Sequence, residues 1–221
     1  MAQLIQWDAV GEKIYETGVD HGVLYVQDPI TGLYPTGVAW NGLTAVTESP
    51  SGAEPNPQFA DNIKYLNLLS AEEFGATVEA FTYPDEFGVC DGSEEPEPGV
   101  FLGQQNRSAF GLVYRTIIGN DVAGQDFGYK LHLVYGCMVS PSEKSYQTIN
   151  ESPEAITFSW ELTTTPAPVT GFKPTASITI DSTKTDPADL AALLVILYGV
   201  SPSTQGRLPM PDEVITLMTQ P

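Results

Sequence analysis

Few side chains in this sequence could do acid–base or nucleophilic chemistry. His21 directly follows Asp20, and a carboxylate beside an imidazole can orient it as a general base. Neither a G-x-S-x-G motif nor a comparable nucleophile motif accompanies the pair. The other histidine, His132, lies between Leu131 and Leu133 on a predicted strand, where a structural hydrogen-bonding role is the commoner one. The sequence therefore predicts no catalytic residue.

Acidic side chains gather in residues 85–99, which raises the question of a metal site. The segment carries six carboxylates and no base. Their spacing does not match the EF-hand pattern, which alternates Asp or Asn around a central Gly and ends on a distal Glu. We predict a solvated charged loop and no metal, with a calcium site as the alternative. The acids are Asp85, Glu86, Asp91, Glu94, Glu95 and Glu97.

The two cysteines give no sign of a metal or redox centre. Cys90 and Cys137 form no C-x-x-C motif, so zinc is not expected. Cys137 continues a strand pattern and is predicted to be a small core residue. Cys90 lies among carboxylates, which should raise its thiol pKa and make it unreactive. No cofactor is predicted.

The charge balance limits the partners of the protein. The chain has 221 residues, with 9 Lys and Arg against 28 Asp and Glu, a net charge of −19. Such a surface repels DNA and anionic membranes, although DNA can pass nearby without sticking. Acidity that only keeps the protein soluble explains the charge equally well. We expect no signal peptide and no membrane anchor, and hence a protein that is made and kept in a cytoplasm.

The elements that must position these residues are mostly β-strands. The clearest pattern lies in residues 127–166, where Tyr129, Leu131 and Leu133 alternate with polar residues and Trp160 and Leu162 repeat the pattern. Residues 108–139 are predicted to form an antiparallel hairpin. Further strands are expected in 22–27, 34–46 with a turn at Asn41-Gly42, 75–84 and 173–183, while 64–70 fits a strand or a helical turn.

The chain is predicted to be mainly β, a sandwich or half-barrel with additions at both ends. Residues 21–183 would form the β domain, preceded by an arm at 1–20 and interrupted by a long polar loop at 47–62. Ser70 and Glu73 match a helix capping box. A short helix over 190–199 is expected to begin at Asp186-Pro187 and to pack on the sheet or on a neighbouring subunit. Residues 184–221 would form this helix and a C-terminal arm.

Much of the chain resembles the major tail tube proteins of long-tailed, non-contractile (siphovirus-type) bacteriophages of Gram-positive hosts. The resemblance is a pattern over many positions and includes no catalytic signature. It implies a β-sandwich or half-barrel whose subunits form hexameric rings, which close an inner β-barrel and stack into a tube that DNA crosses. The residues that carry the resemblance are 7–25, 55–87, 114–121, 127–136, 141–166 and 178–199.

The resemblance also implies where the subunits touch. Strands near 76–83, 109–118, 128–138 and 155–163 are candidates for the inner sheet. Glu79, Arg115, Lys130 and Glu161 are the candidates for the lumen or a subunit interface, with ordinary cross-strand ion pairs as the alternative for the two bases. The candidates for a loop reaching the next ring are Glu48, Glu54, Asn56, Gln58, Phe59, Asp61 and Asn62.

A tail tube protein would be a virion component assembled in the host cytoplasm. Its partners would be further copies of itself and the tape measure, tail terminator and baseplate proteins, with DNA passing unbound. Three alternatives stay open: a host- or carbohydrate-binding β-sandwich module, a tube protein of a contractile or type VI-like injection system, and an acidic hydrolase with two converging carboxylates.

Overall fold

The protein is mainly β, as the sequence predicts. A computed structural model describes residues 5–149, 151–152, 154–201 and 204–219. Strands account for 47% of the structure and helices for 12%, and the sheets are antiparallel. The helices are α1 (Gly88–Asp91), α2 (Pro187–Tyr198) and α3 (Pro211–Leu217), with a 3-10 turn at Asp85–Phe87. The strands are β1 (Tyr15–Val26), β2 (Gly37–Trp40), β3 (Leu43–Glu48), β4 (Ser51–Gly52), β5 (Pro55–Ala60), β6 (Ile63–Leu69), β7 (Glu72–Glu73), β8 (Gly75–Ala80), β9 (Glu94–Glu97), β10 (Val100–Leu102), β11 (Phe110–Asn120), β12 (Gly124–Val139), β13 (Phe158–Thr164), β14 (Ser177–Asp181), β15 (Gly199–Ser201) and β16 (Thr204–Gln205).

The main sheet is organised around β12, which changes partner along its length. Within the described residues the strand order is β2-β1-β11-β12-β13-β8-β3, and β14 also pairs with β12. β14 pairs over Lys130–Val134 and β13 over Cys137–Val139. Gly136 lies between the two stretches with φ +60, where a Cβ would come within 2.2 Å of the carbonyl oxygen of Thr165. Only glycine fits this bend, so the sheet forks here.

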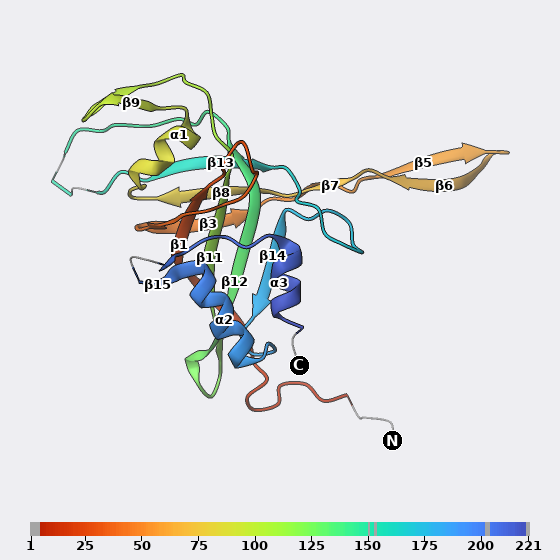
Figure 1. Cartoon of the computed structure of the whole chain (residues 1–221). Helices are drawn as coiled ribbons and strands as arrows, with labels where there is room; N and C mark the ends of the chain where they lie inside the picture. Colours follow the sequence, from red (N-terminus) through yellow and green to blue (C-terminus); the bar gives the residue numbers. More distant parts are fainter. Residues whose placement is uncertain (1–4, 150, 153, 202–203, 220–221) are drawn as a thin grey trace.

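One face of the sheet is covered by α2 and α3 (Figure 1). Asp186 caps α2 by accepting a hydrogen bond from the N–H of Ala188 (2.8 Å), which confirms the predicted helix start. Tyr25 Oη donates to the carbonyl of Leu197 (2.7 Å), so the last turn of the helix is tied to β1. The buried residues on this face are Val23, Tyr25, Tyr34, Val113, Leu131, Leu133, Tyr135, Ala167, Ile180, Leu190, Leu193, Leu197, Leu208 and Val214.

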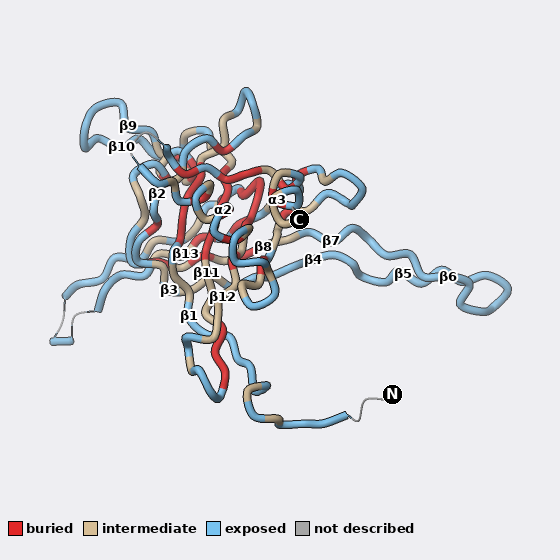
Figure 2. Tube along the Cα trace, turned by 60° about the horizontal axis from the view of Figure 1, so that its bottom comes forward, coloured by how far each residue is buried: buried red, intermediate tan, exposed pale blue. Residues whose placement is uncertain are grey.

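The opposite face of the sheet encloses a second core. The sheet curls so that β1 and β3, far apart in the strand order, come into contact. Trp40, Phe87 and Trp160 meet at the centre, with ring centroids 4.5 to 5.6 Å apart. Figure 2 shows buried residues concentrated in this sheet, whereas the segments that leave it are exposed. Both faces of β11 and β12 are therefore covered in their central part.

Several predicted elements are confirmed by the strands observed. The hairpin predicted at 108–139 is β11 and β12, and the strand predicted at 75–84 is β8. Trp160 and Leu162 of β13 are buried together, as their alternation predicts.

The predicted loop at 47–62 is wrong, because this stretch pairs with the segment that follows it. β5 pairs with β6, and β4 with β7, so residues 51–73 form one long two-stranded hairpin arm. Pro55 and Pro57 are compatible with a strand that has a free outer edge, since no partner needs their missing N–H there. The arm turns at Asp61 and Asn62, both with positive φ, as in a type I′ hairpin turn.

Three further expectations at element boundaries are corrected. Residues 15–20 belong to β1 and not to an N-terminal arm. Ser70 caps no helix: its Oγ accepts from the N–H of Glu54 (3.3 Å) across the arm. The predicted loop at 85–99 contains the 3-10 turn, α1 and β9.

Candidate functional site

The four sequence-predicted lumen or interface residues do not form one cluster. Arg115 pairs across the strand with Leu131 and so lies on the α2 face, whereas Lys130 lies on the other face beside His132. Glu79 and Glu161 lie on the outward face of β8 and β13, and no ion pair among the described residues involves them.

Both basic candidates form cross-strand ion pairs with β1. The Arg115 guanidinium donates to both carboxylate oxygens of Asp20 (2.7 and 2.6 Å) and lies over the ring of Tyr129. This hydrogen bonding holds the pKa of Asp20 below its usual value. Lys130 contacts the carboxylate of Glu16. These pairs neutralise charge on each face of the strands β1, β11 and β12.

Glu48, predicted to belong to a loop reaching the next ring, is instead tied to the sheet. It ends β3, and its carboxylate accepts a hydrogen bond from Tyr114 Oη (2.7 Å). His132 stacks on Tyr114 with ring centroids 4.6 Å apart, and its Nδ1 lies 3.5 Å from Glu48 Oε1. Burial lowers the pKa of His132, which Glu48 opposes. His132 is thus a structural hydrogen-bonding residue that fastens the base of the arm.

The hairpin arm carries the other six loop candidates and extends well beyond the main sheet (Figure 1). Every residue from 47 to 73 is exposed. Such a two-stranded hairpin is marginally stable in water, and exposed apolar surface of this kind marks interaction sites. The arm therefore needs a surface to pack against. Its exposed large apolar residues are Phe59, Ile63, Tyr65, Leu66, Leu68 and Leu69.

The strands β1, β11, β12 and β14 form what we call the four-strand unit, and both its outer edges are open. β2 covers β1 only over Gly22–Tyr25, which leaves the edge of residues 15–21 without a partner strand in the described chain. β14 pairs with β12 on one side and with no described strand on the other. Open edges present unpaired N–H and C=O groups that another chain can bind.

The hydrogen bonds of β14 place Thr179 at this open edge. Tyr135 N donates to Ala176 O (2.8 Å) and Ser182 N donates to Tyr129 O (3.0 Å), so the even-numbered residues face β12. Because hydrogen-bonded and non-hydrogen-bonded pairs alternate in an antiparallel ladder, the N–H and C=O of Thr179 point away from β12. The sequence pattern carries no signal for this, since it does not reveal which strands are neighbours.

The two faces of the four-strand unit differ in character. The α2 face is apolar except for the Arg115–Asp20 pair, and the helix leaves Val195 and Tyr198 of its own exposed. The other face carries Lys130, His132 and Thr179 near Glu16, without a covering helix. On this second face Tyr114 and Val134 belong to the second core, so only its end near Glu16 and Lys130 is open to water or a polar solute.

Exposed apolar side chains also occur outside the arm and the sheet edges. They lie in the N-terminal segment, in β10 and in the segment that follows β12. Trp7, at 77% exposed, is the largest. This distribution favours several contact surfaces over one binding groove. The residues are Ile5, Trp7, Val10, Ile14, Val100, Phe101, Leu102, Tyr146 and Ile149.

The acidic segment is partly neutralised from within the chain. The carboxylate of Asp91 is nearly buried and contacts Lys144 Nζ (2.6 Å). Among the described residues, no group of three or more His, Cys, Asp or Glu side chains could hold a metal ion. Asp91 thus anchors the segment after β12 to α1.

Both cysteines are expected to resist thiol reagents in the folded protein. Burial, with a smaller contribution from Asp91, raises the pKa of Cys90 to about 12, and burial also raises the pKa of Cys137. Burial is thus a larger cause than the acidic neighbours that the sequence pointed to. We expect neither thiol to react with a colorimetric thiol reagent at about pH 8 until urea unfolds the chain. Rapid reaction of one thiol in the folded protein would contradict this packing.

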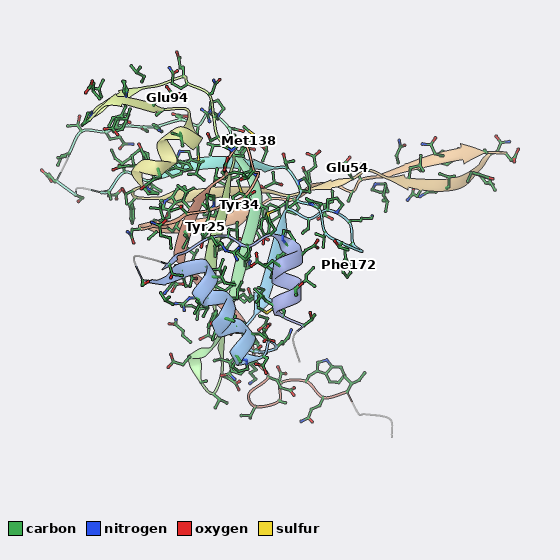
Figure 3. The ribbon with its side chains drawn as sticks, viewed as in Figure 1. Tyr25, Tyr34, Glu54, Glu94, Met138 and Phe172 are labelled. Carbon is green, nitrogen blue, oxygen red and sulfur yellow. The ribbon has the colours of Figure 1, made fainter. Side chains whose placement is uncertain are left out.

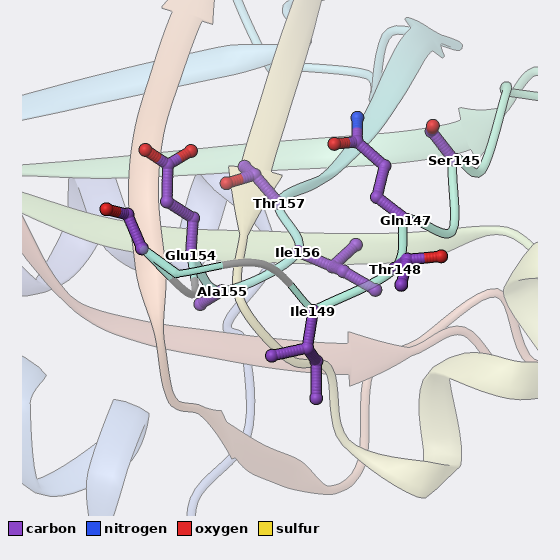
Figure 4. A pocket seen from close by; sticks show the side chains of 9 residues that line it. Ser145, Gln147, Thr148, Ile149, Glu154, Ala155, Ile156 and Thr157 are labelled. Carbon is purple, nitrogen blue, oxygen red and sulfur yellow. The ribbon is translucent and has the colours of Figure 1, made fainter.

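A pocket of about 310 Å³ lies within the segment after β12 (Figure 4). Its walls include Gln147, Ile149, Glu154 and Ile156. Glu154 is the one titratable group among the described lining residues, so no acid–base pair is formed there. The pocket carries no assignable chemistry.

Comparison with models of known protein families gave no match, and neither did comparison with curated proteins. In the described part of the chain, no helix has the length and apolar character needed to cross a membrane. The geometry of the edges, faces and arm therefore carries the functional argument.

Proposed function

We propose that the protein is the structural subunit of a phage tail tube, whose hexameric rings stack and deliver DNA to the host. The observation that carries the proposal is the pair of open strand edges at opposite sides of the four-strand unit. Two different edges on one subunit favour a head-to-tail contact, and such contacts close into rings when the rotation permits.

Strand direction supports this closure. β1, β11, β12 and β14 alternate in direction, so β14 of one copy meets β1 of the next in the antiparallel sense. The pairing of β1 with β11 is interrupted by register shifts between Thr17 and Val19 and between Asp20 and Val23, and bulges of this kind also bend the free edge of β1. A closed sheet abolishes the open edges altogether.

The faces of the four-strand unit fit a channel for DNA. In the proposed ring α2 lies outside and the face with Lys130 and His132 lies inside. Lys130 is neutralised by Glu16, and the net charge of −19 repels phosphate, so DNA slides without being trapped. Tape measure, tail terminator and baseplate proteins would then be the partners at the ends of the tube.

The hairpin arm is suited to contact the next ring. We expect that replacing residues 53–71 by Asn-Gly, a turn that joins the paired residues Gly52 and Glu72, gives a folded subunit that forms rings but no tubes. The reason is that no residue of the arm contributes to the core. Negative-stain electron microscopy measures the outcome.

A second variant keeps the full length of the arm and tests whether the apolar surface of the arm is itself needed for stacking. Leu66 and Leu68 share one face of the hairpin, opposite Gln58 and Asn56, and Leu66→Ser with Leu68→Ser should also reduce stacking. Tubes of normal length from the shortened variant would exclude the role in stacking. Wild-type protein that stays monomeric at every concentration would overturn the proposed function itself.

A further inference from the structure

A second pocket, of about 450 Å³, lies where the open edge of β1 ends. Its walls are the β1 residues Asp20 and His21, the turn between β2 and β3, and Tyr198 at the end of α2. His21 has φ +50 and lies at the register shift of β1 between Asp20 and Val23. That conformation accompanies an imidazole 3.0 Å from Asp20, with its ring 6.3 Å from that of Tyr198. The pocket thus lies at a bulge of β1, beside the last residue of α2.

At the other side of the four-strand unit, Phe172 projects from the loop that leads into β14 (Figure 3). Its side chain is 74% exposed. The loop is nevertheless held in place: Thr170 N and Oγ1 donate to the carboxylate of Asp212 (2.8 and 2.7 Å), and Ala167 and Thr175 exchange backbone hydrogen bonds. A fixed loop that presents an aromatic ring to solvent is typical of a binding anchor.

We propose that Phe172 of one copy fills this pocket of the next copy in the ring. The inference rests on the proposed function and names the contact that would fix its subunit seam. When β14 of one copy pairs antiparallel with β1 of the next copy, the Asp181 end of β14 lies near Tyr15 of that copy and the Ser177 end lies near its His21. β2 covers β1 from Gly22 onward, so the chain before Ser177 must leave the shared sheet beside the pocket.

The loop of Phe172 carries a cation that the subunit leaves unpaired. Lys173, next to Phe172, makes no ion pair among the described residues, whereas Asp20 at the pocket is already paired with Arg115 and His21. Two subunits of net charge −19 repel each other. An unpaired cation at the seam lowers that repulsion where the subunits meet.

Disulfide cross-linking tests the contact directly. Phe172→Cys is combined with Asn41→Cys on the pocket rim, while Cys90 and Cys137 stay buried and unreactive. Mild oxidation of assembled protein should give a ladder of covalent oligomers on a denaturing gel. The control pair, Phe172→Cys with Val122→Cys at the tip between β11 and β12, should give none.

A single substitution gives an independent readout. Phe172→Ser should raise the concentration needed for ring formation by about tenfold or more, because a large apolar contact is lost. Ile30→Ser, at a still more exposed apolar residue (92%) that does not line the pocket and lies outside the Phe172 loop, should leave it unchanged.

The outcomes separate this inference from the function on which it rests. Rings that form normally, with no cross-link through Asn41 and no effect of Phe172→Ser, overturn the contact and leave the tube proposal standing. Covalent dimers from protein that never forms rings support the contact and contradict the tube.

Discussion

Thr179→Pro is expected to abolish ring formation while the subunit stays folded. The N–H of Thr179 points to the open edge of β14. Proline at this position therefore removes a donor that a strand of the neighbouring copy needs, and it leaves every hydrogen bond between β14 and β12 in place. The ring of proline also obstructs close approach of another strand. Sedimentation velocity of the purified variant should show monomer at concentrations where the wild-type protein assembles.

Thr179→Ala is the matched control for this substitution. It removes the side chain, including the contact of Oγ1 with His132 Nδ1 (3.4 Å), and keeps the backbone N–H. We expect it to assemble as the wild-type protein does. Rings from the proline variant, or loss of rings from the alanine variant, would contradict pairing through the β14 edge.

Trp160→Ala is expected to cost about 3–5 kcal/mol of unfolding free energy, the largest effect on stability that we predict. The Trp160 side chain is fully buried, with Phe87 at 5.2 Å, Tyr83 at 5.4 Å and Trp40 at 5.6 Å between ring centroids. The surrounding strands cannot close over the space that it leaves. Urea unfolding followed by circular dichroism measures the loss.

An exposed tryptophan provides the control. Trp7→Ala removes a side chain of the same size that is 77% exposed, so the unfolding free energy should change by no more than about 0.5 kcal/mol. A loss below about 1 kcal/mol for Trp160→Ala would show that the second core is not packed as described.

Local patterns in the sequence predict the strands of the main sheet well because each of them has at least one face with buried or half-buried apolar side chains. The alternation around Tyr129, Leu131 and Leu133 placed β12 and its α2-facing side correctly. The same alternation predicts a polar outward side at Lys130 and His132, but His132 is stacked on Tyr114, and Val134 on this side is buried in the second core. Two-sided burial of a central strand depends on how the sheet curls, which its own residues do not specify.

The composition of residues 47–62 predicts a loop, whereas the structure has one strand of the hairpin arm there. Prolines, asparagines and a glycine in residues 47–62 are typical of loops, yet a two-stranded ribbon tolerates them at its outer edges and at its turn. The alternation in β6 was too weak to distinguish a strand from a helical turn, because neither of its faces is buried in the subunit.

The candidate surfaces were only partly predictable. Six of the seven residues named for the contact between rings lie on the arm, while Glu48 fastens its base. Arg115 and Lys130 turned out to lie on opposite faces of one sheet. The sequence alone does not single out Thr179 or Phe172, because their significance comes from long-range pairing and from the position of a pocket on the other side of the subunit.

The central claim is that neighbouring subunits join through β14 and β1 with the Lys130 face toward a channel. Cryo-electron microscopy of the concentrated protein tests this most directly. We predict closed rings in which β14 of each subunit runs antiparallel to β1 of the next, with α2 on the outside. Monomers alone, or rings in which α2 lines the channel or other edges form the seam, would contradict the account.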